Sequence, residues 1–320
     1  MSIPSPRAGR LLLIFIDGLG LGAADPRINP VAAAGARLLP VAGMTRVALD
    51  GVVAAADARL GVAGIPQSAT GQTALFTGYN APRLVGAHCV GFPRASLRRR
   101  LLRRNLLLTL RRQGRRAEFV NAYPRHAALL NAGKIRIARD GRLRADGDVP
   151  PAVLRRLSVT TVSALTAGQR FRDLADLQAG RAVYHDFTNR ILRELGEAVP
   201  LLTPAQAGRQ LWRCARDLEF ALYEHFLTDR AGHHGDFAAA VRRVKDLDAF
   251  LAALLAGALP AGATVLLTSD HGNLEDLRAR QHTGNPVPVV AWGPQAVLLT
   301  RGVRKLTELY PRITAHMAAH

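Results

Sequence analysis

Three runs of mostly apolar residues are the clearest structural signal in the chain. They lie at 11–16, 264–268 and 287–292, and each is five or six residues long. Such short continuous runs, bounded by polar or Gly-rich segments, are typical of strands buried on both faces of a sheet. The sequence therefore predicts three buried strands.

Apolar residues recur at helical spacing in the segments 204–228 and 237–255, which predicts a helix over each segment. Strands that alternate with helices form an open sheet covered by helices on both faces. We therefore expect an α/β protein with three layers and an open, mostly parallel sheet. In such sheets, ligands bind beyond the carboxyl ends of the strands.

The middle of the chain has a different character. Residues 94–116 include ten Arg and no acidic residue, interleaved with Leu, which predicts one basic amphipathic helix. A short strand at 118–121 and a hairpin at 134–144, with its turn at Asp140-Gly141, are expected next. We interpret 84–190 as an inserted small cap domain. The flanking segments, 1–83 and 191–320, then form one discontinuous core domain.

Composition and charge narrow the function classes. The chain has 320 residues, is 48% apolar and carries a net charge of +19. A basic surface favours polyanions, but no recognised nucleic-acid motif accompanies the charge. We therefore expect a small phosphorylated substrate, and keep a basic protein that binds nucleic acid or an anionic surface as the alternative of another class. The apolar runs are too short for a membrane span or a signal peptide, which predicts a cytoplasmic protein without a membrane partner.

Three Asp and three His stand at predicted strand ends or in Gly-rich loops, and they include a directly adjacent Asp-His pair. Carboxylate and imidazole are suitable ligands for divalent metals of borderline softness. Each residue alone has an ordinary structural explanation, such as a turn or a surface pair, but together they indicate a metal site. The six residues are Asp17, Asp229, His233, Asp270, His271 and His282. The two cysteines, Cys89 and Cys214, have no ligand-like spacing, and we expect them to be structural thiols in the core.

The segments around these residues resemble the alkaline phosphatase superfamily, and within it the cofactor-independent phosphoglycerate mutases and phosphopentomutases. The resemblance covers about the first 80 residues and about 220–293. It rests on Leu-Ile-Phe-Ile-Asp17-Gly, Asp229-x-x-x-His233, Ser269-Asp270-His271-Gly272-Asn273-x-Glu275 and His282-Thr283-x-Asn285-Pro286-Val287-Pro288.

The resemblance implies an alkaline phosphatase-like fold and two divalent metal ions, with manganese or zinc expected and magnesium possible. One ion would be held by Asp229, His233 and His282. The other would be held by Asp17, Asp270, His271 and the nucleophile. The spacing of Ser68 to Gly71 and Gly78 matches the mutases and favours Ser68 as nucleophile and metal ligand. Thr70 is the alternative, and either residue could instead open a helix.

The implied activity is that of a metal-dependent phosphohydrolase or phosphotransferase that forms a phosphoserine. A phosphomutase is the alternative within the same class. Candidates for substrate binding lie in the Arg-rich segment, namely Arg98, Arg99, Arg103 and Arg104. His185-Asp186 is expected to be structural, with a role toward substrate as the alternative. The sequence does not indicate the substrate or the oligomeric state.

Overall fold

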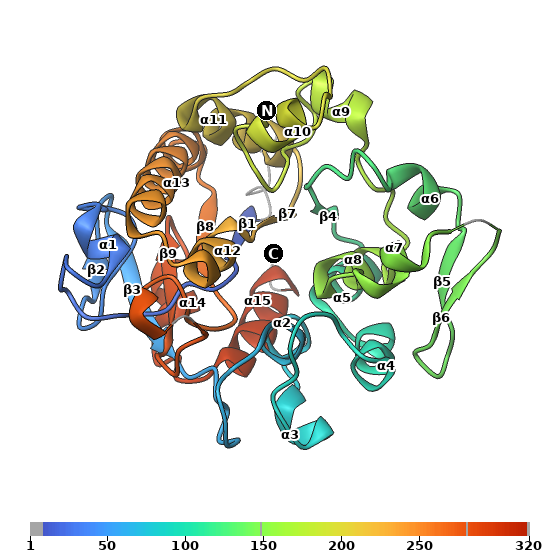
Figure 1. Ribbon diagram of the computed structural model, residues 1–320, viewed down its shortest axis with the longest axis horizontal. Coiled ribbons are helices and arrows are strands. Elements are labelled where there is room, and N and C mark those ends of the chain that lie inside the picture. Colours follow the sequence, from blue (N-terminus) through green and yellow to red (C-terminus); the bar gives the residue numbers. More distant parts are fainter. Residues whose placement is uncertain (1–8, 148, 280, 319–320) are drawn as a thin grey trace, which may run out of the picture.

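The computed structural model describes residues 9–147, 149–279 and 281–318. A seven-stranded sheet crosses the molecule in the order β2-β3-β9-β8-β1-β7-β4 (Figure 1). Its strands are β1 (Leu11–Ile16), β2 (Arg46–Val47), β3 (Gly51–Ala56), β4 (Ala117–Phe119), β7 (Phe220–His225), β8 (Thr264–Thr268) and β9 (Val287–Trp292). Neighbours among β4, β7, β1 and β8 are parallel, whereas β9 is antiparallel to both β8 and β3. The expected mostly parallel α/β sheet is confirmed.

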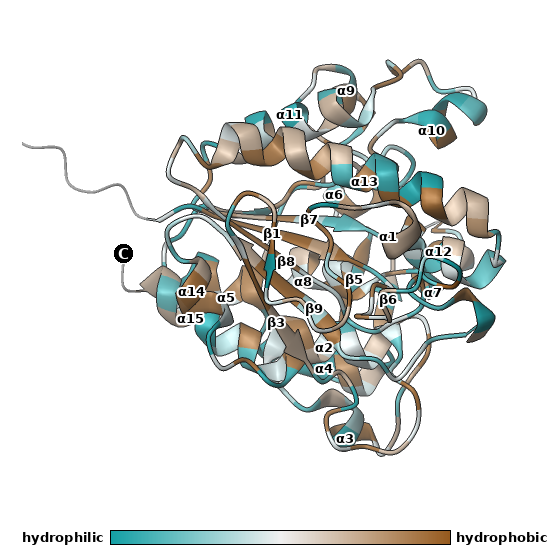
Figure 2. Cartoon of the chain, turned by 90° about the vertical axis from the view of Figure 1, so that its left-hand side faces the viewer, coloured by the Kyte–Doolittle hydropathy of each residue, from teal (hydrophilic) through white to brown (hydrophobic). Residues whose placement is uncertain are grey.

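Helices cover both faces of the sheet (Figure 2). Alternate residues of β1 belong to two separate apolar clusters: Leu12, Ile14 and Ile16 to one, Leu11, Leu13 and Phe15 to the other. The first cluster contains residues of α1 (Pro30–Ala33), α11 (Pro204–Ala215) and α13 (Phe237–Ala258), and the second contains residues of α2 (Ser68–Thr77), α5 (Leu106–Arg112), α8 (Val159–Thr166), α14 (Ala296–Thr300) and α15 (Leu309–Ala318). This is the expected three-layer arrangement, because a strand alternates its side chains between two faces.

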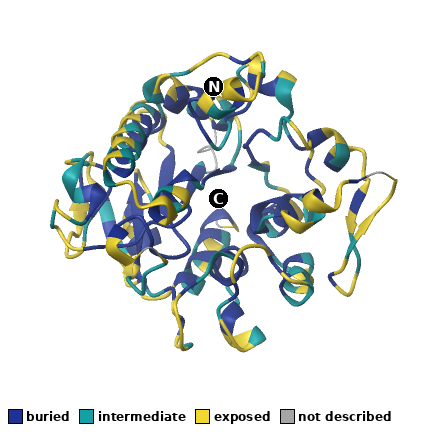
Figure 3. Ribbon diagram, viewed as in Figure 1, coloured by how far each residue is buried: buried dark blue, intermediate teal, exposed yellow. Residues whose placement is uncertain are grey.

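The segment 84–190 divides into two parts. One part belongs to the main layers, since β4 is an edge strand of the central sheet and α5 and α8 pack beneath it. The other part stands to one side and includes α6 (Ala127–Asn131), α7 (Pro151–Arg155) and the antiparallel hairpin of β5 (Ile135–Ile137) and β6 (Leu143–Ala145) (Figures 1 and 3). The domain boundaries at 84 and 190 stay predictions.

The remaining elements are short. They are the α-helices α3 (Ala81–Val85), α4 (Ala95–Arg103), α9 (Leu174–Gln178), α10 (Arg190–Glu194) and α12 (Leu227–His234), and the 3₁₀ helices η1 (Leu277–Ala279) and η2 (Leu306–Glu308). No helix in the described part of the chain is long and apolar enough to cross a membrane. Cys89 and Cys214 are both free thiols; Cys89 is buried as expected, whereas Cys214 is half-buried.

Two helix predictions were wrong. The Arg-rich segment 94–116 is not one helix, because α4 ends at Arg103 and the side chain of Asn105 caps a new helix by accepting a hydrogen bond from Leu108 N. The segment 204–228 contains α11 but then enters β7, which pairs with β1 along its whole length. The apolar residues after 215 fit a helical stripe equally well, and only the pairing with β1 selects the strand.

Candidate metal centre

The metal-ligand candidates meet at one edge of the sheet. Asp17 directly follows β1, and Asp270-His271 follow β8, which is the neighbour of β1. Asp229 lies in α12, which begins just after β7, the other neighbour of β1. Since these three strands are parallel, their carboxyl ends place the three loops side by side. The fold thus explains how residues more than 200 positions apart converge.

The first group of side chains surrounds His271. Its Nε2 atom lies 3.2 Å from Asp17 Oδ1, 3.5 Å from Asp270 Oδ2 and 3.0 Å from the Ser68 hydroxyl oxygen. Asp17, Asp270 and His271 are buried, whereas Ser68 is half-buried. The four residues predicted to share one ion are therefore together in space.

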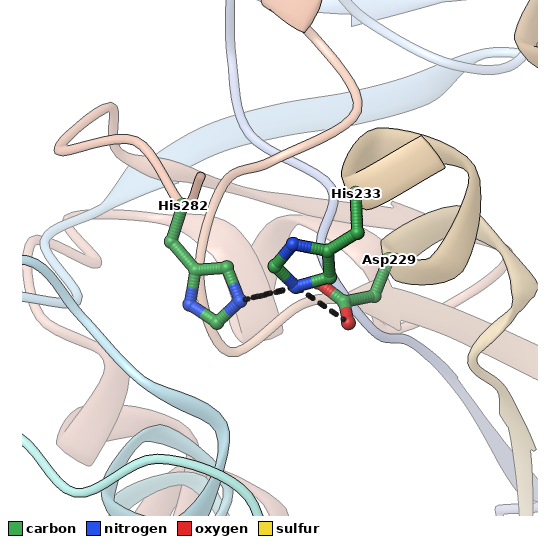
Figure 4. Close-up of side chains that lie close together, drawn as sticks. All are labelled: Asp229, His233 and His282. Carbon is green, nitrogen blue, oxygen red and sulfur yellow. Dashed lines mark hydrogen bonds and ion pairs between the residues drawn. The ribbon is translucent and has the colours of Figure 1, made fainter. Parts of the chain in front are cut away.

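The second group is formed by Asp229, His233 and His282 (Figure 4). His233 Nε2 lies 3.4 Å from Asp229 Oδ2, and His282 Nε2 lies 3.3 Å from Asp229 Oδ1. The Nε2 atoms of the two histidines are 3.2 Å apart and face each other (Figure 4). His282 Nδ1 is hydrogen-bonded to Pro66 O at 3.0 Å, which leaves Nε2 for the group. This set is also the one that the sequence predicted.

The two groups share a residue. Carboxylate oxygens of Asp229 lie within 4.8 Å of ligand atoms of His233 and His282. They also lie within 4.8 Å of ligand atoms of Asp17 and His271. The rings of His271 and His282 stack with centroids 3.7 Å apart, which joins the groups directly. The sequence assigned Asp229 to one set only, because residue spacing carries no information on which loop lies between two others.

The charge in this site fits a divalent cation. Asp17 Oδ1 and Asp270 Oδ2 are buried, and apart from their contacts with His271 Nε2 they have no hydrogen-bond partner in the described structure. Burial, together with the neighbouring Asp270, raises the pKa of Asp17 well above its usual range. Burial also opposes ionisation of Asp229, but the hydrogen bond from His282 and the nearby His271 hold its pKa at about 2. Buried carboxylates gathered in this way require a compensating cation, and a bound metal ion supplies it.

When no metal ion is bound, protons compensate the negative charge of these carboxylates. Burial lowers the pKa of His271, but the adjacent Asp270 and Asp17 more than offset it and raise the pKa to about 10. His271 is then protonated at neutral pH and must lose that proton to bind a metal ion through Nε2.

We therefore expect metal uptake near pH 7 to release protons and metal affinity to rise with pH up to about pH 10, because the His271 pKa lies near that value. Titration calorimetry at pH 7 in two buffers of different ionisation enthalpy measures the release. His88→Gln is the control, since His88 is half-buried beside Val62 O and belongs to neither ligand group. Heats that do not depend on the buffer would contradict the protonated His271.

Glu275 holds the loops of the site together. Its buried carboxylate accepts hydrogen bonds from Gly20 N at 2.9 Å, Asn273 N at 2.8 Å and Asn285 Nδ2 at 3.0 Å, and one from the Thr283 hydroxyl. It thereby ties together the loops after β1 and β8 and the loop that carries His282. The sequence resemblance included this residue without indicating its task.

The structure distinguishes the two candidate hydroxyls. Ser68 is the first residue of α2 and its hydroxyl faces His271. Thr70 is fully buried; its hydroxyl donates to Gln67 O and accepts a hydrogen bond from Cys89 N. Gln67, not Ser68 or Thr70, is the N-cap, and its side chain makes no capping bond. The geometry thus favours Ser68, although its role as nucleophile stays a prediction.

The Ser-x-x-Gly spacing also has a structural reason. A β-carbon added at Gly71 would lie 2.6 Å from the backbone oxygen of Asp270, closer than such contacts allow. A glycine one turn after Ser68 therefore lets α2 approach the loop after β8, so that Ser68 reaches His271.

Part of the chain is similar to known metalloenzymes. Residues 216–319 match the family model described as Metalloenzyme superfamily. A phosphoglycerate mutase of the 2,3-bisphosphoglycerate-independent type from Methylobacillus flagellatus is 33% identical over 96 residues, which span 28% of this chain and 19% of the mutase. The corresponding mutase from Saccharophagus degradans is 39% identical over 94 residues, which span 27% and 18%. The matched segment thus covers about a fifth of these relatives.

The whole fold is similar to alkaline phosphatase from the Antarctic bacterium TAB5, with a TM-score of 0.56, 13% identity and coverage of 96% of this chain and 97% of that one. Residues 216–319 are thus similar to the metalloenzyme superfamily, and the fold is similar to that of alkaline phosphatase. These similarities support a metalloenzyme.

A cavity of about 550 Å³ opens beside Ser68. Three arginines line it: Arg125, Arg156 and Arg230. Arg125 lies 4.0 Å from Glu197, and no ion pair occurs for Arg156 or Arg230 among the described residues. The sequence pattern did not indicate these three residues, because their side chains come from separate loops and helices that only the fold brings together.

The predicted substrate-binding arginines lie outside this cavity. Arg98 donates hydrogen bonds to Gly141 O and Pro93 O, and Arg104 stacks over Tyr79 with its guanidinium 3.9 Å from the ring centre. Arg99 and Arg103 line a separate small depression of about 130 Å³. None of these four arginines lines the cavity beside Ser68.

The neighbouring residues His185 and Asp186 have different surroundings. The Asp186 carboxylate accepts hydrogen bonds from the Thr188 hydroxyl at 2.6 Å and from Ile191 N at 2.8 Å, which is a local structural task. His185 lines the cavity beside Ser68. The expected structural role therefore fits Asp186, and the alternative role toward substrate fits His185.

Proposed function

We propose that the protein is a two-metal phosphohydrolase or phosphotransferase that acts on a small phosphate ester through Ser68. The observation that carries this proposal is the Ser68 hydroxyl, which lies 3.0 Å from His271 Nε2 at the wall of a cavity open to substrate. Of the two candidate hydroxyls, only that of Ser68 borders both the metal ligands and the cavity.

The side chains available suit two ions. Asp229, His233 and His282 would hold one ion, while Asp17, Asp270, His271 and Ser68 would hold the other, with Asp229 between the two. Mixed imidazole and carboxylate ligands suit manganese or zinc, and magnesium is a further candidate. When bound, such ions lower the pKa of a coordinated hydroxyl and neutralise charge on phosphate oxygens.

Ser68 Oγ would attack phosphorus in line, forming an O–P bond as the bond to the leaving alcohol oxygen breaks, which gives a phosphoserine. Ser68 is the first residue of the ten-residue helix α2, whose N-terminal dipole favours the negative charge of the phosphate. If water then accepts the phosphoryl group from Ser68, the reaction is a hydrolysis. If another alcohol accepts it, the reaction is a transfer.

A phosphomutase is the second candidate. It is favoured by the similarity of a segment of this chain to phosphoglycerate mutases. Such an enzyme must keep the dephosphorylated intermediate bound and exclude water while the phosphate moves to another oxygen. The hydrolase or transferase is preferred because the cavity is lined in part by exposed residues, including Arg125, His126 and Arg156.

An activity screen with added manganese, zinc or magnesium tests the proposal. Phosphomonoesters, phosphodiesters and sugar phosphates are the substrates, and released phosphate and isomerised product are both measured. Metal-dependent phosphate release is the expected result, and isomerisation without release would favour the mutase. Tight, steeply salt-dependent binding of random duplex DNA without any turnover would contradict the proposal and favour a nucleic-acid-binding protein.

The cavity arginines should determine affinity for the substrate. We expect KM to rise about threefold to tenfold in each of Arg125→Gln, Arg156→Gln and Arg230→Gln. Solvent weakens the attraction between a partly exposed guanidinium and an anion, so removing one guanidinium should weaken substrate binding only moderately. Steady-state kinetics measures the change. The double variant of Arg99→Gln with Arg103→Gln is the control and should leave KM unchanged, since both side chains lie outside the cavity. A raised KM in the double variant, with an unchanged KM in the three single variants, would assign substrate binding to α4.

A further inference from the structure

Aromatic rings are concentrated in the cavity beside Ser68. The chain is poor in aromatic residues, with 5% Phe, Trp and Tyr. Yet four of them, Phe92, Tyr123, Tyr184 and Phe226, are among the 20 residues that line this one cavity, where about one would be expected. The phosphate-binding chemistry described above uses none of them.

Three rings form a continuous row on one wall. The ring centres of Tyr184 and His185 are 3.8 Å apart, and those of His185 and Phe226 are 4.0 Å apart with an angle of 25° between the planes. All three side chains are half-buried. The stacked pair of Phe187 and Phe250 differs, because both of its rings are fully buried in the core. The row at the cavity therefore keeps ring surface open to a ligand.

This wall carries no charge of its own at neutral pH. Burial, together with nearby His225 and Arg230, lowers the pKa of His185 well below its usual range. Burial and Asp186 raise the pKa of Tyr184 to about 12. The imidazole and the phenol are thus both neutral, and the wall offers flat ring surface and not an ionic contact.

Phe92 adds a ring from a different segment. It lies in the loop before α4 and its side chain is 44% exposed. Its ring is therefore partly accessible to a molecule in the cavity that it lines. Phe92 and Phe226 thus border the same space from separate parts of the chain.

Building on the proposed function, we propose that the phosphate ester accepted by this cavity carries a planar aromatic or heteroaromatic ring in its alcohol part. The ring lies against Phe226 and Phe92, and the phosphate points to Ser68. A volume of about 550 Å³ has room for one ring system with its phosphate. Aromatic pairs prefer offset or edge-to-face contacts, which a saturated ring of similar size does not reproduce.

A pair of matched inhibitors tests the flat ring directly. Phenylphosphonate and cyclohexylphosphonate have the same charge and a similar size, and neither contains an ester bond to hydrolyse. With the metal-loaded full chain, phenylphosphonate should bind about threefold to tenfold more tightly, the range that corresponds to ring stacking. Equal affinity, tighter binding of the cyclohexyl compound or binding of neither compound would overturn the proposal.

Variants of the cavity phenylalanines test which rings cause the preference for the phenyl compound. Phe226→Leu and Phe92→Leu should each reduce the ratio of the two inhibition constants toward one. Phe237→Leu is the matched control, because Phe237 is also half-buried but does not line the cavity, and the ratio should keep its wild-type value. Phe92 is exposed enough that its replacement does not endanger folding. A ratio that stays unchanged in both cavity variants would contradict the assignment of these rings.

The two proposals fail separately. Calorimetry measures phosphonate binding without any turnover, so a preference for the phenyl compound in a protein that turns over no phosphate ester would reject the proposed function and keep the ring site. Turnover of phosphate esters without a preference for the phenyl compound would reject the ring site and keep the function.

Discussion

Replacement of Ser68 by Ala should lower turnover of any phosphate ester by about 10³-fold or more, because it removes the hydroxyl that forms the covalent intermediate. The fold should be kept, since Ser68 is half-buried and makes no helix cap. Metal binding at Asp229, His233 and His282 should also persist. Steady-state kinetics and metal analysis of the purified variant measure these outcomes.

Thr70→Ala is the matched control for this experiment. Thr70 lies two residues further along the same helix, and its hydroxyl bonds to Gln67 O and Cys89 N. Its loss should reduce the free energy of unfolding by about 1–2 kcal/mol and leave most of the turnover. Rapid quench followed by peptide mass spectrometry identifies the residue that carries phosphate. Phosphate on Thr70, or full activity in Ser68→Ala, would overturn the assignment.

Loss of the Asp229 carboxylate should have the largest effect on metal content. Asp229 contributes to both ligand groups, so Asp229→Ala is expected to weaken both sites and to lower turnover about as much as Ser68→Ala. His233→Ala should weaken only the site that contains His233 and His282, because His233 is in one group and is partly exposed. The ligand count of a site largely sets its metal affinity.

Metal analysis after dialysis, together with thermal unfolding with and without manganese or zinc, separates these cases. Asp217→Ala is the control, since its side chain is 83% exposed and its one ion pair among the described residues is with Arg216. Equal metal content in Asp229→Ala and His233→Ala would show that Asp229 serves a single site. A wild-type chain that takes up no divalent ion would reject the metal centre as a whole.

Much of the architecture was predictable because it depends on local patterns. The runs at 11–16, 264–268 and 287–292 are strands with these bounds, and the helix predicted at 237–255 is α13. A strand buried on both faces needs a continuous apolar run, and that signal is local. Residues that directly follow such strands were predictable as site residues for the same reason, because strand ends set their position.

Where two local explanations compete, the pattern alone was insufficient. The apolar residues at 218, 222 and 226 fit a helical stripe, but pairing with β1 places 220–225 in the sheet. Likewise, Leu and Arg alternate in helical fashion through 94–116, but α4 ends at Arg103 and Asn105 caps the next helix. In both places a tertiary contact or a single capping bond outweighs periodicity.

By itself, the sequence determined the α/β class, the strand ends and the residues that gather at the metal centre, because each of these follows from a few neighbouring positions. Only the tertiary structure decided that Asp229 lies between two ligand groups, that Ser68 and not Thr70 faces His271, and that the cavity takes its arginines and rings from separate segments. These features depend on distances between loops that are far apart in the chain, and such distances are set by how the layers pack around the sheet.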